Sequence, residues 1–261
     1  MSILDQIVND KKIEVSKRKN IFPASYLEAS PLFERATKSL SDNLRKSKSG
    51  IIAEYKRRSP SKKNINNSLS VIEVSEGYEK AGVSGMSILT DGKYFGGSLD
   101  DINLARSATK FPLLRKEFII DEYQIIEAKA HGADVILLIA SVLNYKEIKD
   151  FSYLAKKFDL EILLEVHNLQ ELEKSIMTSI DMIGVNNRNL KNFEVSLDNS
   201  RKLASEIPDE FVKISESGIN EIESIKELMN LGYKGFLIGE NFMKTDNPGM
   251  SASEFIKKIE R

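Results

Sequence analysis

The feature that most restricts the fold of this chain is a repeating order of short apolar strands and amphipathic helices after residue 50. Apolar runs of strand length lie at 51–55, 86–89, 112–114, 135–139, 161–166, 182–185, 211–214 and 236–238. Eight strands that each precede a helix predict an α/β fold, a (β/α)8 TIM barrel. The alternative is a doubly wound sheet, which has about five or six strands, and no G-x-G-x-x-G turn follows the first strand here.

Capping residues indicate where the helices begin and end. A polar residue is followed three positions later by an acid or amide at Ser70/Glu73, Asp121/Gln124, Asn144/Glu147, Asn168/Glu171 and Asn220/Glu223. Two predicted helices end at a glycine, Gly132 and Gly232. We expect His131 to cap the first of these ends or to interact with the helix dipole there.

The first 48 residues differ from this repeat and are predicted to form a helical extension. An apolar stripe with helical spacing begins the chain, at Ile3, Leu4, Ile7 and Val8, and Ser2 with Asp5 resembles a capping pair. Pro23 and Pro31 interrupt the segment, and residues 41–49 are interpreted as a polar, basic link into the first strand. So few apolar residues cannot form a core alone. We therefore expect residues 1–48 to pack on a barrel domain formed by residues 49–261.

Composition excludes several classes of function. A net charge of −1 argues against a nucleic-acid or anionic-membrane partner, which would normally leave a basic excess. The absence of cysteine excludes disulfides, thiolate catalysis and cysteine-ligated metals. Two histidines at this spacing match no metal motif. No signal peptide, transit peptide or membrane span is recognisable, so we expect a cytoplasmic protein without a membrane partner. We further expect a monomer without a metal.

Ionisable residues end the first strand, where a buried strand should not carry charge. Ile52, Glu54 and Lys56 lie two apart and therefore share one face of the strand, before Ser59 and Pro60 turn the chain. In a barrel enzyme the carboxyl ends of the strands carry the active site. The competing interpretation of this stretch alone is an internal ion pair without chemistry.

Other strand ends carry polar residues too, and this favours a shared site. They are Lys116, Glu165, Asn186, Arg188, Glu216 and Glu240. Leu114 shares a strand face with Lys116, and Leu163 with Glu165, so charges should follow apolar residues into the barrel. Two turns of small residues follow the last two strands and suit phosphate binding. Residues 217–219 precede a predicted helix capped at Asn220, and residues 239–241 lie at the start of the last predicted helical turn.

Two further stretches have less specific patterns. Residues 94–97, Tyr-Phe-Gly-Gly, are interpreted as a loop over the barrel mouth, where an aromatic residue either packs structurally or forms a wall for a flat substrate. His167 follows Glu165 by two positions and is near enough in the strand to contact a site.

The chain resembles the indole-3-glycerol phosphate synthase family along nearly its whole length. The stretches that carry the resemblance are IIAEYKRRSPS, SILTDGKYFGGS, PLLRKEFI, GADVILLIA, LLEVHN, IGVNNRNL, SESGI and FLIGENFM. The resemblance implies a (β/α)8 barrel whose N-terminal extension lies over the active-site face. It also implies conversion of 1-(2-carboxyphenylamino)-1-deoxy-D-ribulose 5-phosphate to indole-3-glycerol phosphate, CO2 and water, without metal or organic cofactor.

The same resemblance assigns roles to individual positions. It implies that Lys116 is the principal general acid, that Glu165 is the carboxylate base, and that Lys56 is a second catalytic lysine. Further catalytic positions are implied at Glu54, Asn186, Glu216 and Ser217, with substrate binding by Ser59 and Arg188. An apolar wall for the substrate ring is implied at Phe95, Phe118 and Leu137, and phosphate binding at Gly218, Gly239 and Glu240.

Two departures and one hypothesis accompany this assignment. Residues 62–65 lack the glycine common in the family's mobile loop, and the chain has no tryptophan to place near the substrate ring. A lysine with an ordinary pKa of about 10.4 is a poor acid near neutrality. We therefore expect burial and the neighbouring Lys56 to lower the pKa of Lys116.

Two other functions fit parts of the pattern. Phosphoribosylanthranilate isomerase shares the barrel and phosphate site but uses a cysteine base, and this chain has no cysteine. A non-catalytic barrel that binds a phosphorylated metabolite would be favoured by loss of Lys116 or Glu165, and both are present.

Overall fold

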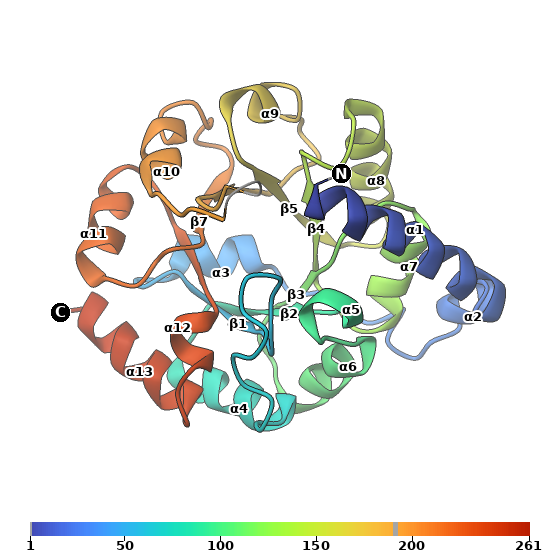
Figure 1. Ribbon diagram of the computed structural model, residues 1–261, viewed down its shortest axis with the longest axis horizontal. Helices are drawn as coiled ribbons and strands as arrows, with labels where there is room; N and C mark the ends of the chain where they lie inside the picture. Colours follow the sequence, from blue (N-terminus) through green and yellow to red (C-terminus); the bar gives the residue numbers. More distant parts are fainter. Residues whose placement is uncertain (1, 190–192) are drawn as a thin grey trace.

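Eight parallel strands form a closed barrel in the computed structural model, which describes residues 2–189 and 193–261 (Figure 1). The strands are β1 (Ile51–Tyr55), β2 (Gly85–Leu89), β3 (Leu113–Lys116), β4 (Val135–Ile139), β5 (Glu161–Val166), β6 (Met182–Asn186), β7 (Val212–Glu216) and β8 (Gly235–Ile238). β8 closes the barrel against β1, where Ile51 pairs with Phe236. The predicted barrel is confirmed. Leu190, which ends the IGVNNRNL stretch, lies outside the described residues.

Helices surround the barrel as an outer ring (Figure 1). They are α4 (Val71–Ala81), α6 (Leu99–Ala108), α7 (Tyr123–Ala130), α8 (Tyr145–Lys157), α9 (Leu169–Glu173), α10 (Asp198–Leu203), α11 (Ile222–Asn230) and α13 (Pro248–Ile259). Two short helices, α5 (Gly92–Phe95) and α12 (Glu240–Met243), lie nearer the centre in this view. The predicted caps are confirmed at Ser70, Asn144 and Asn168, whose side chains accept from backbone N–H groups three residues on. His131 is the C-cap of α7.

Two of the predicted caps are wrong. Helix α7 begins at Tyr123 after Glu122, and Gln124 instead binds the loop that follows β3. The Gln124 side chain accepts from the Ile120 N–H at 2.8 Å and donates to the Phe118 carbonyl at 2.9 Å. Helix α11 begins at Ile222 after Glu221, so Asn220 does not cap it. In both places the loop continues further than the local sequence pattern indicates.

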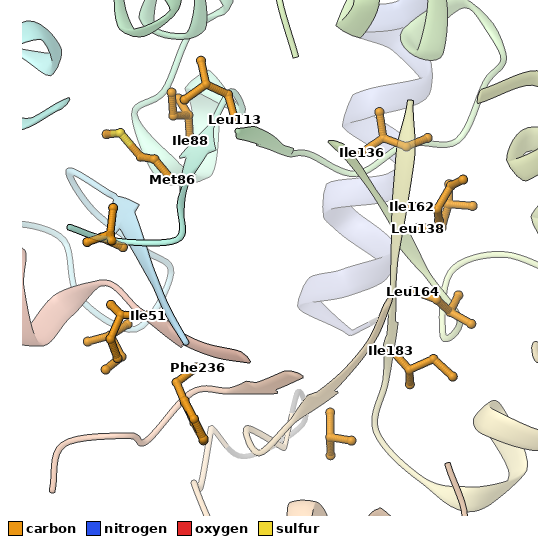
Figure 2. Close-up of a cluster of buried hydrophobic side chains, with 14 of the residues drawn as sticks. Ile51, Met86, Ile88, Leu113, Ile136, Leu138, Ile162, Leu164, Ile183 and Phe236 are labelled. Carbon is orange, nitrogen blue, oxygen red and sulfur yellow. The ribbon is translucent and has the colours of Figure 1, made fainter. Parts of the chain in front are cut away.

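The apolar residues of the strands alternate between two layers. One layer faces the surrounding helices and includes Ile51, Met86, Ile136, Leu164 and Phe236 (Figure 2). The other fills the barrel interior and includes Ile52, Leu114, Leu163 and Leu237. Because side chains two apart share a face, Glu54, Lys116 and Glu165 continue the interior layer at its carboxyl end. The predicted inward direction of these charges is confirmed.

The N-terminal segment contains a helix that closes the bottom of the barrel. This helix occupies most of residues 41–49, so the prediction of a polar link there is wrong. Helix α3 (Leu40–Lys46) buries Leu40 and Leu44 in the interior layer. A Cβ at Gly85, the first residue of β2, would lie 2.6 Å from the Leu40 side chain. The Glu161 carboxylate accepts from the backbone N–H groups of Leu40 at 2.7 Å and Ser41 at 3.0 Å, which fixes the start of α3.

The first helix lies at the opposite end of the barrel, beside α5 and α7 (Figure 1). Helix α1 (Ile3–Ile21) opens with the predicted capping box of Ser2 and Asp5, and α2 (Ala24–Glu28) follows Pro23. The Lys11 ammonium is buried between Asp91 at 3.0 Å and Glu117 at 3.1 Å. These ion pairs hold α1 over the carboxyl ends of the strands. Within the described residues, none of the helices has the length and apolarity to cross a membrane.

Candidate active site

A single cavity of about 670 Å³ at the carboxyl ends of the strands brings the predicted site residues together. Its size lies within the usual range for a small-molecule site. All predicted site residues line it: Glu54, Lys56, Ser59, Phe95, Lys116, Phe118, Leu137, Glu165, Asn186, Arg188, Glu216, Ser217, Gly218, Gly239 and Glu240. In a (β/α)8 barrel this end carries the active site, so the cavity is the candidate site.

Two clusters of opposite charges lie in this cavity. Lys116 of β3 donates to Glu165 of β5 at 3.1 Å and also makes a close contact with Glu216 of β7. Lys56, just beyond β1, pairs with Glu54 at 2.6 Å. The three carboxylates are almost fully buried, and each therefore depends on its cation, because an unpaired buried charge is costly.

The expected lowering of the Lys116 pKa is wrong. Burial alone would lower it, but the carboxylates of Glu216 and Glu165 outweigh burial and raise the pKa of Lys116 above its ordinary value. The sequence argument placed Lys56 beside Lys116, whereas Lys56 is engaged by Glu54. Lys116 is therefore protonated at neutral pH. The same ion pairs make its ammonium a weaker acid, so proton donation from Lys116 requires its contacts with Glu165 and Glu216 to loosen.

Glu216 has the opposite perturbation. Burial raises the pKa of Glu216 to about 7, although the nearby Lys116 ammonium opposes the rise. Gly184 provides the space for this side chain, because a Cβ at position 184 would lie 2.2 Å from Glu216 Oε1. A carboxylic acid with a pKa near neutrality exchanges protons readily at physiological pH. Sequence reasoning recognised Glu216 but not its dependence on Gly184.

We expect Glu216→Gln to change the pH dependence of stability. An acid whose pKa is raised in the folded state stabilises that state when protonated, and the contribution is lost between the unfolded value near 4.5 and about 7. Relative to the wild type, the variant should gain on the order of 2 kcal/mol as pH rises through this window, since one pKa unit is about 1.4 kcal/mol. Urea unfolding at pH 5 and pH 8 measures this, with exposed Glu223→Gln as control. A constant difference at both pH values would contradict the raised pKa.

Two asparagines at the end of β6 hold neighbouring site residues in place. The Asn186 amide donates to Glu165 Oε1 at 3.1 Å, and its Oδ1 accepts from the Arg188 N–H at 3.0 Å. Asn187 points the other way and was not predicted. It is buried and donates to Ser215 Oγ and to the Glu216 carbonyl, both at 3.0 Å, which joins β6 to β7. Strand parity would have indicated its outward direction, but not its partners.

The apolar wall forms between α5, β3 and α1. The Phe95 and Phe118 rings lie 6.0 Å apart, and Leu137 lines the same cavity. Asp91 caps α5 by accepting from the Tyr94 N–H at 2.7 Å. The first two residues of the predicted loop at 94–97 are therefore the last two residues of this short helix. Three α1 residues that sequence reasoning did not assign to the site, Ile3, Leu4 and Ile7, complete the wall. The sequence signals for them are the apolar stripe and the expected position of the extension over the active-site face.

The turns after β7 and β8 form the other end of the cavity. Ser217 and Gly218 both have positive φ, +68° and +76°, a turn in which consecutive backbone N–H groups can face an anion. Gly239 is the N-cap of α12, and a Cβ there would lie 2.5 Å from Glu54 Oε1. Helix α11 begins at Ile222, so its N-cap is Glu221 rather than the predicted Asn220, and Asn220 itself lines the cavity.

The loop after β1 reaches this end of the cavity. The Lys62 ammonium pairs with the Glu240 carboxylate at 2.7 Å, with both side chains nearly half exposed. The loop is closed on itself by Ser59 N–H, which donates to the Lys62 carbonyl at 2.8 Å. Across residues 2–189 and 193–261, no group of three or more His, Asp or Glu is arranged to hold a metal ion.

Comparison with known proteins gives one consistent family. A family model described as indole-3-glycerol phosphate synthase matches residues 4–255. A protein of that name from Bacteroides thetaiotaomicron is 45% identical, and the match covers 99% of both chains. One from Caldanaerobacter subterraneus subsp. tengcongensis is 42% identical over 98% of both, and one from Campylobacter curvus is 40% identical over 94% of this chain and 95% of the relative.

Solved structures of distant proteins share the barrel. The structure of KGPDC from Streptococcus mutans has a TM-score of 0.61 at 14% identity and covers 80% of this chain and 98% of its own. A thiamine phosphate pyrophosphorylase from Pyrococcus furiosus has a TM-score of 0.58 at 16% identity, covering 81% of this chain and 97% of its own. At such identities the similarity supports the fold alone.

Proposed function

The chain belongs to the indole-3-glycerol phosphate synthase family, and from that premise we propose how its own residues carry out the family's reaction. The reaction closes the indole ring of 1-(2-carboxyphenylamino)-1-deoxy-D-ribulose 5-phosphate with loss of CO2 and water. Its substrate has an anionic phosphate at one end and a carboxylated aromatic ring at the other. The cavity has backbone turns and cations at one end and an apolar wall at the other, which supports this substrate class.

Lys116 is the proton donor for ring closure in this proposal. Attack of the ring carbon on the substrate's C2 carbonyl requires that the carbonyl oxygen receive a proton as the bond forms. Lys116 lies at the centre of the cavity and is held protonated by Glu165 and Glu216. The position of Lys116 between these two carboxylates is the observation that carries the proposal, because it provides an acid and two potential bases within one cluster.

Lys56 is proposed to bind the substrate carboxylate until CO2 leaves. Its side chain is one-fifth exposed and its ammonium already pairs with Glu54, so a substrate carboxylate would share or replace that partner. Glu54, Glu165 and Glu216 are then available to accept protons during rearomatisation and dehydration. Glu216, with its pKa of about 7, is suited to both accepting and returning a proton near neutrality.

Binding is proposed to divide along the cavity. Phe95, Phe118 and Leu137 contact the aromatic ring, while Gly218, Gly239 and Glu240 supply backbone N–H groups to the phosphate. Ser59, Asn186, Arg188 and Ser217 orient the sugar between them. The carboxylate of Glu240 is turned aside by its ion pair with Lys62, which limits its repulsion of the phosphate.

A direct assay tests this function. Purified protein is mixed with the carboxyphenylamino substrate, and formation of the indole product is followed by fluorescence. Because the chain contains no tryptophan, its own emission in the indole range is low. We expect turnover without added metal or cofactor. Binding of the substrate without an indole signal would instead support a non-catalytic phosphometabolite-binding barrel.

We also propose that the chain acts as a cytoplasmic monomer without a nucleic-acid partner, and that residues 1–48 form an extension of the barrel rather than a separate domain. The net charge of −1 supports the absence of a nucleic-acid partner. Burial of Leu40 and Leu44 in the barrel interior supports the single domain. Sedimentation equilibrium at the mass of two chains would contradict the monomer.

A further inference from the structure

His167 lies behind the candidate base, at a position that the proposed reaction leaves unused. Its ring is mostly buried, and its Nδ1 lies 3.2 Å from Glu171 Oε2, while its backbone N–H donates to the same oxygen at 2.9 Å. Glu171 is in the first turn of α9, so the ring is oriented from that helix. Its other nitrogen, Nε2, lies 3.6 Å from Glu165 Oε1.

The Nε2 atom is buried and has no hydrogen-bond partner among the described residues. Buried polar atoms are normally satisfied, and one that is not requires an explanation. The nearest acceptor is the Glu165 carboxylate, and hydrogen bonds in empty active sites are often long and tighten when the substrate binds. The separation of 3.6 Å is therefore a contact that a small shift of Glu165 would turn into a hydrogen bond.

The charges in the cavity also favour a cation at this position. Lys116 is the partner of two carboxylates, Glu165 and Glu216, whereas Lys56 is taken by Glu54. One ammonium therefore serves two buried acids. A protonated His167, paired with Glu171 through Nδ1, would place a positive charge on the side of Glu165 that Lys116 does not contact, since Lys116 bonds Oε2 and His167 faces Oε1.

We propose that His167 is a positioning residue that acts on the reaction through Glu165, holding this carboxylate ionised and directed into the cavity. The proposal rests on the role of Glu165 as the base. Burial lowers the pKa of His167, but its hydrogen bond to Glu171 and the charges of Glu165 and Glu216 outweigh burial and raise it. Reciprocally, burial raises the pKa of Glu165, and Lys116 and then His167 lower it below the ordinary value.

The two histidines of the chain make this coupling measurable by NMR. His131 is the natural control: it caps α7, its Nδ1 lies 3.2 Å from Asn103 Oδ1, and burial and then Arg115 lower its pKa. Imidazole resonances of the wild type, assigned with His131→Gln, should give a pKa above the ordinary 6.5 for His167 and below it for His131. In Glu165→Gln the pKa of His167 should fall by about one pH unit, because a carboxylate within a few ångströms is removed.

The kinetic test uses His167→Gln, which keeps a neutral donor but removes the charge. The acid limb of kcat against pH should move to higher pH by about one unit, since Glu165 then protonates more easily. KM should change less than twofold, and His131→Gln should leave the profile where it was. A His167 that only supports the start of α9 would lower kcat equally at all pH values, which would overturn the proposal.

The NMR result separates failure of this inference from failure of the proposed function. An unchanged His167 titration in Glu165→Gln would overturn the coupling even in a fully active enzyme. Conversely, a chain without turnover that still shows the coupled titration would contradict the proposed reaction and leave the His167–Glu165 pair in place.

Discussion

Lys116→Ala is expected to lower kcat by about 10²- to 10⁴-fold, the usual contribution of a positioned acid or base. The ammonium is the group shared by Glu165 and Glu216, so its removal takes away the proton donor and leaves two carboxylates facing each other. Glu216, whose pKa is already about 7, should then be protonated at neutral pH. The indole fluorescence assay measures the loss of turnover.

Binding should survive this substitution. Lys116 contacts the carboxylates of Glu165 and Glu216, whereas other residues form the proposed phosphate contacts and the apolar wall. Calorimetry should therefore give a product affinity within about tenfold of the wild type, or about 1.4 kcal/mol. Lys116→Arg separates charge from proton transfer, because arginine keeps the positive charge but its guanidinium is not deprotonated in proteins. We expect it to be nearly as inactive as the alanine variant.

A buried lysine elsewhere provides the matched control. Lys213 of β7 is 7% exposed, and its ammonium donates to the Ala204 carbonyl at 2.9 Å, outside the residues that line the cavity. Lys213→Met removes a similar charge and should leave kcat nearly unchanged. Near-normal turnover in Lys116→Ala would remove Lys116 from the role of proton donor.

Much of the candidate site was predictable because strand parity is a local property. Ile52 and Glu54 are two residues apart on a strand, as are Leu114 and Lys116, and a buried apolar residue therefore fixes the direction of the charge that follows it. The strand bounds at β1, β4 and β5 agree with the sequence prediction because each strand contains a short apolar run, which is also a local pattern. The family resemblance then gave roles to these positions.

Features that depend on distant partners were missed. Residues 41–46 look like a polar link because α3 is short, and its helix is stabilised by the burial of Leu40 and Leu44 and by the Glu161 carboxylate, which is far away in the chain. The pKa of Lys116 is raised rather than lowered because Glu216, from β7, pairs with its ammonium. No local sequence pattern indicates which cation the Glu216 carboxylate will contact. Similarly, nothing local assigns Ile7 of α1 to the cavity wall.

The largest loss of stability is expected from Asp134→Ala, at the start of β4. This carboxylate is fully buried and joins the N-terminal segment to the barrel: its two oxygens pair with Arg35 at 2.8 Å and Arg106 at 2.7 Å. It also accepts from the backbone N–H groups of Lys38 at 2.9 Å and Leu113 at 2.8 Å. Four donors from three parts of the chain therefore depend on one side chain.

Removing this carboxylate leaves the buried Arg106 guanidinium without its counter-ion, because its remaining bonds are to the carbonyls of Thr109 and Phe111. Breaking such a pair typically costs about 3–5 kcal/mol in the free energy of unfolding. Urea unfolding measures this loss. Asp198→Ala is the control, because its pair with Arg201 is exposed and screened by solvent and should contribute little to stability. A similar loss of stability in the two variants would contradict a main role for Asp134 in attaching the extension to the barrel. The burial of Leu40 and Leu44 would then be the main attachment of this segment.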